Sequence, residues 1–311
     1  MEIKQYTPDC ADEWNQFVSA SKNGTFLFDR RFMDYHSDRF SDHSLMCYRE
    51  GRLYALLPAN EKGDTLVSHG GLTYGGLVTD SRCSAKGVLD TFTAINDYLR
   101  AAGFRHVVYK AIPWIYHQMA AEEDLYAICR TSDARLQERD LGTCIIQRNA
   151  IRWERIRRRA LKRAQEAGLT VERSTDYAGF WQVLNDNLRM KYDSKPVHTL
   201  DEISLLASRF PDNIVLYLAK QGNDILAGMV IYVSAQVVRA QYSSATPLGK
   251  QLGAIDILYD RIICHDYIDW PYFEFGTSAE PDSNAILEPL VFQKEGFGGR
   301  GIVFDRYEWD L

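Results

Sequence analysis

The chain has 311 residues, of which 46% are hydrophobic and 25% are charged, and its formal net charge at pH 7 is −6. This composition is typical of a globular protein with a large core, and the length suggests about two domains. The acidic balance argues against a protein whose whole surface coats nucleic acid, although it leaves room for a local basic patch.

The N-terminal stretch MEIKQYTPDC lacks the basic segment and the apolar run of a signal peptide. The longest apolar run, ILAGMVIYVSAQVV, is too short to cross a bilayer. The cysteines form no CxxC pair, and no cluster of His and Cys has zinc-site spacing. We therefore expect a cytoplasmic protein with reduced thiols, no membrane span and no bound metal; the oligomeric state stays open.

The first half of the chain shows an ordered series of predicted elements, with turns at Gly51 and at Gly63-Asp64 between alternating apolar runs. In chain order these are helices 11–24 and 30–40, strands 45–50, 52–61 and 65–79, helix 84–103 and strand 106–113.

The second half repeats this order. Its predicted elements are helices 177–192 and 199–210, strands 214–220, 224–234 and 235–246, helix 253–268 and strand 272–278. The repetition indicates a tandem duplication of one α/β unit with mixed sheets, in domains 1–147 and 148–311. The alternative is a chance agreement of two α/β segments.

The order of helix pair, hairpin, third strand, glycine turn, helix and fifth strand resembles the acyl-CoA N-acyltransferase (GNAT) unit. The tandem form is similar to the Fem-type, or FemAB-like, peptidoglycan aminoacyltransferases. Three stretches carry the likeness: IRRRALKRAQEAGLTVE, SHGGLTYGGL, and FEFGTS followed by KEGFGG.

The resemblance implies two tandem GNAT-like domains that move an acyl or aminoacyl group onto an amine, such as a cell-wall or polysaccharide precursor. The donor would be acyl-CoA or aminoacyl-tRNA, and no further cofactor would be required. A catalytically inactive duplicated fold that binds a nucleotide sugar or a peptide is the alternative.

The glycine turn after the strand 235–246 is the predicted donor site. A helix that begins near Gly253 would offer unpaired N–H groups and a positive dipole end to a phosphate. The turn departs from the Q/R-x-x-G-x-G/A loop of typical GNAT enzymes, so a tight connection without a ligand is the alternative. The candidate donor contacts are Ser243, Ser244, Gly249, Lys250 and Gly253.

Three residues are candidates for the chemistry. The resemblance implies that Lys294, in the stretch KEGFG, contacts the donor, and an ammonium there would stabilise a tetrahedral oxyanion. We expect this lysine to be partly exposed in the main cleft of the second domain, within reach of Tyr242, which could protonate the leaving group. Backbone N–H groups around Tyr242 to Ser244 are the expected oxyanion donors. His69 is a candidate general base, or else a structural strand histidine.

The polar segment between helices 177–192 and 199–210 is the predicted acceptor site. Lys195 and His198 could bind an anionic acceptor there, and Thr199 with Glu202 predicts a capping box. A capped loop without a ligand is the alternative. Tyr74, in the glycine-rich stretch of the first half, and Glu274, in strand 272–278, are further candidate acceptor contacts.

The run from Arg148 to Arg163 contains eight basic residues and one acid. On a helix, Ile156, Ala160, Ala164 and Ala167 form one apolar stripe and the arginines surround it. The run is either a solvated helix face or a contact for a phosphate-rich partner, tRNA or a nucleotide-linked acceptor.

Overall fold

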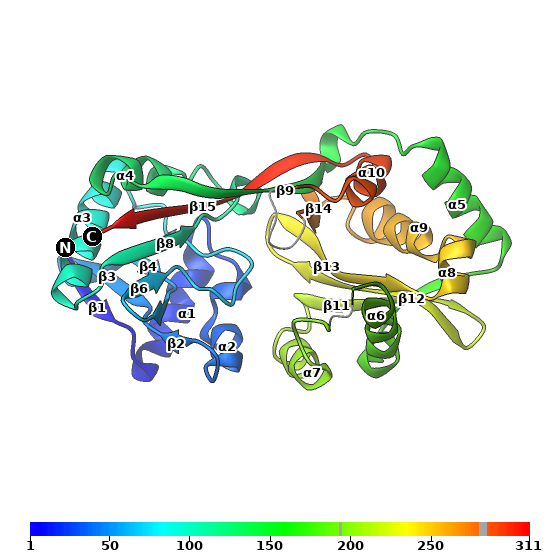
Figure 1. Cartoon of the computed structure of the whole chain (residues 1–311), viewed down its shortest axis with the longest axis horizontal. Coiled ribbons are helices and arrows are strands. Elements are labelled where there is room, and N and C mark those ends of the chain that lie inside the picture. Colours follow the sequence, from blue (N-terminus) through cyan, green and yellow to red (C-terminus); the bar gives the residue numbers. More distant parts are fainter. Residues whose placement is uncertain (193–194, 280–284) are drawn as a thin grey trace. The chain divides into compact units, whose positions relative to one another are not determined.

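The computed structural model of the chain describes residues 1–192, 195–279 and 285–311 (Figure 1). The chain divides into two compact units, unit 1 with Met1–Asp140 and Val303–Leu311, and unit 2 with Leu141–Ile302. These ranges differ from the predicted domains 1–147 and 148–311, because the chain crosses between units within two long strands, β9 (Arg135–Ile146) and β15 (Arg300–Asp310).

Unit 1 begins with a short strand and two helices and ends with a helix that precedes β9. Its elements are β1 (Glu2–Gln5), α1 (Ala11–Ala20), α2 (Arg30–Met33), β2 (Ser41–Asp42), β3 (Leu45–Arg49), β4 (Arg52–Leu57), β5 (Asn60–Lys62), β6 (Thr65–Val67), β7 (Val78–Thr79), α3 (Ala85–Ala101), β8 (His106–Lys110) and α4 (Glu123–Thr131).

Strands of unit 1 form one sheet in the order β1-β3-β4-β7. Its other strands are paired in the order β15-β8-β6-β5-β2. Strands β6 and β8 pair in parallel. The β5–β6 pair and the β8–β15 pair are antiparallel. Helix α3 starts where Ser84 accepts a hydrogen bond from the Gly87 N–H (3.2 Å), and its residues Phe92, Ile95 and Leu99 are buried in the core.

Unit 2 contains a continuous sheet in the order β10-β11-β12-β13-β14-β9. Among the described strand pairs of this sheet, β13–β14 is parallel and the others are antiparallel. A π-helical segment, Asp260–Asp266, continues α9. The elements are α5 (Arg155–Glu166), β10 (Thr170–Ser174), α6 (Tyr177–Tyr192), α7 (Leu200–Arg209), β11 (Ile214–Gln221), β12 (Asp224–Val233), β13 (Val237–Ala245), α8 (Pro247–Leu252), α9 (Ala254–Tyr259), β14 (Tyr272–Thr277) and α10 (Glu288–Gly296).

The two faces of this sheet are covered by different helices. Helices α6 and α7 lie on one face of β11, β12 and β13, and α9 lies on the other (Figure 1). Side chains alternate between the faces along each strand. Phe273 and Phe275 therefore enter the core beneath α9, while Glu274 between them points to the face of α6 and α7.

The parallel pair β13–β14 is short and then ends. It runs from Val237↔Tyr272 to Arg239↔Glu274, whereas β13 continues to Ala245. Gln241 is an extra residue in the β12–β13 ladder, because Tyr242 faces Val230 while Ala240 faces Ile231. We call the region beyond Arg239 and Glu274, where the described strands no longer pair, the β13–β14 split.

Most predicted elements are present, and several differ. The strands expected over 52–61 and 65–79 are each two short strands, β4 with β5 and β6 with β7, and the helix expected over 30–40 is α-helical only in α2. The short helix α8 before Gly253 and the helix α10 were not predicted. Among the described residues, none of the helices has the length and apolar character needed to span a bilayer.

Candidate active site

A tyrosine and a histidine meet at the β13–β14 split. The Tyr242 hydroxyl lies 2.5 Å from Nδ1 of His198 and accepts a hydrogen bond from the His198 backbone N–H at 3.4 Å. Tyr242 comes from β13, immediately after the extra residue Gln241, and its ring also packs edge-on against Trp181 of α6. The structure thus brings together a predicted catalytic residue and a predicted acceptor residue that are 44 positions apart in the sequence.

The segment that carries His198 is held at several points. Its carbonyl accepts a hydrogen bond from the Trp181 indole N–H (3.3 Å). The predicted capping box of α7 is confirmed: Thr199 Oγ accepts from the Glu202 N–H, and the Glu202 carboxylate accepts from the Thr199 N–H. Because His198 is itself only 6% exposed, its ring has a fixed place beside Tyr242.

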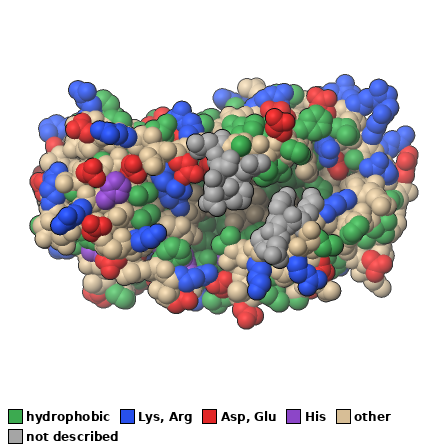
Figure 2. All heavy atoms as spheres, in the orientation of Figure 1, with side chains coloured by type: hydrophobic (Ala, Val, Ile, Leu, Met, Phe, Trp, Pro, Cys, Tyr) green, Lys and Arg blue, Asp and Glu red, His purple; other side chains and the backbone are tan. Residues whose placement is uncertain are grey.

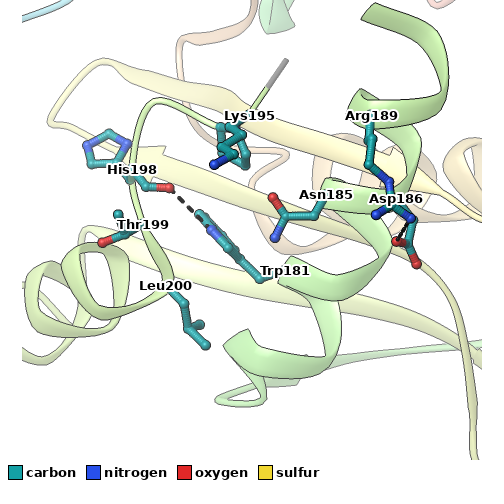
Figure 3. Close-up of a pocket in the computed structure, with 9 residues that line it drawn as sticks. Trp181, Asn185, Asp186, Arg189, Lys195, His198, Thr199 and Leu200 are labelled. Atoms are coloured by element: carbon teal, nitrogen blue, oxygen red, sulfur yellow. Dashed lines mark hydrogen bonds and ion pairs between the residues drawn. The ribbon is translucent and has the colours of Figure 1, made fainter. Parts of the chain in front are cut away.

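A cavity of about 530 Å³ opens beside this pair. It is lined by Trp181, Asn185, Asp186 and Arg189 of α6, and by Lys195 and His198 of the α6–α7 connection. In Figure 3, His198 lies at one side of the cavity and the Arg189–Asp186 pair lies at the other. The predicted acceptor residues Lys195 and His198 therefore share one cavity.

A buried ion pair marks the start of the split. Arg239 donates a hydrogen bond to the Glu274 carboxylate, whose second oxygen accepts from the Gly276 N–H. The Glu274 side chain is 0% exposed. Its oxygens are thus occupied by protein donors, and the expectation that Glu274 contacts the acceptor is corrected: it links β13 and β14 where their pairing stops.

Lys294 is also buried, contrary to the expectation of a partly exposed lysine. It lies on α10, is 5% exposed, and donates to the carbonyls of Gly276 (2.8 Å) and Thr277 (2.7 Å) and to the Ser278 hydroxyl (2.8 Å). An ammonium has three N–H donors, so none remains for an oxyanion. Lys294 holds the end of β14 in place, and burial lowers its pKa to about 8.

The glycine turn is packed against its own chain. Thr246 caps α8 by accepting a hydrogen bond from the Gly249 N–H (3.0 Å), and the Lys250 ammonium donates to the Asn187 side chain. A Cβ on Gly249 would lie 2.1 Å from the Leu226 carbonyl oxygen. The expected helix start near Gly253 is confirmed, since Gly253 is the N-cap of α9, but with φ of +85° it also ends α8, a short helix that was not predicted.

Two other predicted donor contacts, Ser243 and Ser244, lie on opposite faces of β13. The Ser243 hydroxyl hydrogen-bonds to Tyr259 beneath α9, and the Ser244 hydroxyl donates to the Val183 carbonyl of α6 at 3.4 Å. Their side chains thus make hydrogen bonds within the fold.

Beyond Arg239, the edge of β13 that faces away from β12 has no partner strand among the described residues, so alternate backbone N–H groups there remain candidate oxyanion donors.

If Gly253 serves close packing, replacing it by alanine should destabilise the protein without any ligand. A Cβ there would lie 2.4 Å from the Ala160 carbonyl of α5. We expect Gly253→Ala to lower the free energy of unfolding by about 2 kcal/mol more than Gly222→Ala. Gly222 is a matched control, because it has φ of +60° with open space around it. Equal losses in urea unfolding would mean that the close approach to α5 has no energetic weight.

The two predicted site residues of unit 1 are core residues, which corrects both expectations. Tyr74 is 2% exposed, and its hydroxyl is 3.1 Å from the Thr25 hydroxyl. His69 is 3% exposed, and burial lowers its pKa to about 3. A base with so low a pKa takes up protons poorly at neutral pH. The glycines around His69 pack on neighbouring protein: a Cβ on Gly75 would overlap the Ser68 carbonyl.

The basic run forms α5, whose inner face is narrower than predicted. Ala160 and Ala164 are buried, but Ile156 is exposed. Arg157 turns inward and pairs with Asp256 at 3.2 Å; burial still raises the pKa of Asp256 to about 6. Exposed Lys and Arg side chains gather over α5 (blue in Figure 2), and within the described chain the side chains of Arg155, Arg159 and Arg163 make no hydrogen bond or ion pair.

The structure adds Trp181 and Arg239 to the site, neither of which was predicted. Arg239 had a usable signal, because a charged residue inside the apolar run VVRAQY, together with Glu274 inside YFEFG, indicates a buried pair. No sequence signal distinguished Trp181, because it follows Phe180 in a helix with an apolar face, where a core residue is expected.

Comparison with known proteins assigns this architecture to a class. Residues 148–282 match the model of the acetyltransferase (GNAT) domain. No sequence match to a curated protein was found. This part of unit 2 is therefore similar to a GNAT domain, and the predicted mixed α/β fold is confirmed.

Solved structures extend the likeness to the whole chain. FemX is 11% identical, with 100% of this chain and 98% of that chain covered and a TM-score of 0.69. The C-terminal domain (DUF2156) of a putative lysylphosphatidylglycerol synthetase from Agrobacterium fabrum is 14% identical, with 90% of each chain covered and a TM-score of 0.59. A tandem GNAT protein from the clavulanic acid biosynthesis pathway is 9% identical, with 99% and 98% covered and a TM-score of 0.52. The chain has a FemAB-like tandem GNAT fold.

Proposed function

We propose that this protein is an N-acyltransferase that moves an acyl or aminoacyl group from an activated donor to an amine. The observation that carries the proposal is the Tyr242–His198 pair at the β13–β14 split, whose His198 also lines a cavity formed by α6 and the α6–α7 connection. The match of residues 148–282 to the GNAT domain supports the same reaction class.

The chemistry follows from the groups at the split. The amine nitrogen attacks the carbonyl carbon of a thioester or ester, a C–N bond forms, and the C–S or C–O bond breaks. Backbone N–H groups on the free edge of β13 stabilise the oxyanion. The amine proton leaves through the Tyr242 hydroxyl to the departing sulfur or oxygen, while Nδ1 of His198 holds that hydroxyl in place. No cofactor beyond the donor takes part.

The donor and acceptor are tested together. Acetyl-CoA, a long-chain acyl-CoA and an aminoacyl-tRNA are each incubated with the protein and an amine mixture, and mass spectrometry identifies acylated products. Thermal shift reports binding independently, since a bound donor raises the melting temperature. The resemblance to Fem-type enzymes favours a cell-wall precursor as acceptor. The putative lysylphosphatidylglycerol synthetase, by its name, points to a lipid-linked one. Absence of product with every donor would count against the proposal.

A binding module without catalysis is the second candidate, and the packed glycine turn favours it. The Gly249 N–H is already capped by Thr246, and the adjacent cavity is lined by the carboxylate of Asp224, which repels phosphate. A protein that binds nucleotide sugars or peptides but forms no product, with unchanged binding in Tyr242→Phe, would be such a module.

The exposed arginines of α5 are proposed as a tRNA contact. If they bind phosphates, replacing Arg155, Arg159 and Arg163 by alanine should reduce the dependence of log binding constant on log salt by about 2 to 3. The charge-matched control replaces Arg52, Arg105 and Arg135, which are exposed in unit 1. Filter binding of tRNA between 50 and 300 mM salt, about the range where such contacts are lost, measures both. Equal slopes in the two triple variants would mean that α5 is a solvated face.

A further inference from the structure

The cavity beside Tyr242 and His198 has an uneven charge. Of the side chains that line it in the described chain, Arg189 and Lys195 are basic and Asp186 is acidic. Arg189 and Asp186 lie 3.8 Å apart on successive turns of α6, so their charges largely offset one another. Lys195 makes no ion pair or hydrogen bond with any described residue, which leaves one uncompensated positive charge.

That charge lies beside the reacting groups and not on an arbitrary part of the surface. In Figure 3, Lys195 stands between His198 and the Arg189–Asp186 pair, above Asn185 and Trp181. The backbone on its C-terminal side is fixed by the Trp181–His198 hydrogen bond and by the capping box at Thr199. A ligand that fills the cavity therefore lies next to both Lys195 and His198, the residue that contacts Tyr242.

The other lining residues and the size of the cavity also limit which ligands can bind. Trp181 gives an apolar surface, and the Asn185 amide supplies both a donor and an acceptor. A cavity of about 530 Å³ is within the usual size range for small-molecule sites of roughly 300–1,000 Å³. It is large enough for a compact amine with one charged substituent.

We infer that the acceptor amine carries an anionic group, a carboxylate or a phosphate, which Lys195 binds while the nitrogen faces Tyr242 and His198. This inference rests on the proposed function, because it specifies the acceptor of that same site. Lys195 is a specificity-determining residue in this arrangement and takes no part in proton transfer.

The test uses matched probes and an equilibrium readout that does not need turnover. Propylamine, β-alanine and phosphoethanolamine present an amine alone, an amine with a carboxylate and an amine with a phosphate. Their dissociation constants are measured by NMR titration, with the Trp181 indole N–H signal, assigned through Trp181→Phe, as the report from the cavity. We expect the two anionic probes to bind at least about tenfold more tightly than propylamine, equivalent to about 1.4 kcal/mol, and to lose this advantage in 0.5 M salt.

Lys195→Gln should abolish the preference and leave propylamine binding unchanged. Lys162→Gln is the control, because Lys162 is an exposed lysine on α5 that pairs with Glu166 at 3.6 Å. Preference for β-alanine alone or phosphoethanolamine alone identifies the anion. Charge-selective binding without product formation would support the cavity assignment and count against the acyltransfer. Turnover of neutral amines that is equal or faster, and insensitive to Lys195→Gln, would overturn the inference and leave the acyltransfer standing.

Discussion

Replacing Tyr242 by phenylalanine should lower turnover at least about a hundredfold, the lower end of the contribution from a positioned general acid or base. The change removes one oxygen, which is 2.5 Å from Nδ1 of His198, and keeps the ring against Trp181. KM should change little, because the hydroxyl acts on the proton in transit and not on ground-state binding. Steady-state kinetics with the donor and amine identified by product analysis measures both constants.

Tyr177→Phe is the matched control for this substitution. Tyr177 is buried in unit 2, and its hydroxyl donates to the Ile214 carbonyl at 3.3 Å, whereas Tyr242 is partly buried. Each variant loses a side-chain hydrogen bond inside the fold, at a cost of about 1–2 kcal/mol of stability, so the melting temperature of Tyr242→Phe should fall by no more than that of Tyr177→Phe. Wild-type turnover in Tyr242→Phe would remove this hydroxyl from the mechanism; an equal loss in both variants would attribute the effect to stability.

Replacing Lys294 by methionine should lower the free energy of unfolding by about 3–5 kcal/mol, because three acceptors inside the fold lose a charged donor. Methionine fills similar space but leaves the carbonyls of Gly276 and Thr277 and the Ser278 hydroxyl without their donor. A partly exposed lysine, as the sequence predicted here, would contribute little to stability. Urea unfolding at pH 7 measures the change.

The titration of Lys294 determines how the stability difference between wild type and Lys294→Met changes with pH. Burial lowers its pKa from 10.5 to about 8 in the folded protein. Between these values the unfolded chain holds more protons than the folded one, so the contribution of this group to stability rises as pH increases. The gap between wild type and Lys294→Met should therefore widen between pH 8 and pH 10. A gap that narrows would contradict the assignment of a buried, charged lysine at neutral pH.

Lys110→Met separates packing from function in the lysine variants. Lys110 is a lysine of unit 1 that donates to the carbonyls of His69 and Leu72, and burial also lowers its pKa to about 8. Both variants should be destabilised. If Lys294 positions the end of β14 for the reaction, only Lys294→Met should lose turnover at a temperature where both proteins are folded.

Local signals in the sequence predicted much of the fold. Helix α3 has its cap at Ser84 and α7 has its capping box at Thr199 and Glu202, and both were placed within a few residues. These signals are short-range, because a cap involves residues two or three positions apart. Helix α10 lacks such a signal: Leu287 provides no side-chain cap, and the segment EPLVFQKEG has little apolar periodicity.

The contacts within the candidate site could be predicted less well from the sequence. Lys195 and His198 were expected to share a site, but the partner of His198, Tyr242, comes from a strand 44 residues away. Lys294 was expected to be partly exposed in the main cleft of the second domain, because the resemblance implies that it contacts the donor. Its burial depends on backbone carbonyls of Gly276 and Thr277, and no side-chain pattern in the sequence records where those carbonyls point.

The pair of Arg239 and Glu274 restricts how this protein can diverge over evolutionary time. Both side chains are largely withdrawn from water, and each satisfies the other where two neighbouring strands part. A mutation at either position alone leaves an uncompensated charge inside the protein, which is among the costliest single changes a fold can undergo. A lineage can exchange the pair for apolar residues only by passing through that costly intermediate or by changing both codons together. The two positions therefore behave as one inherited character, retained or replaced as a unit.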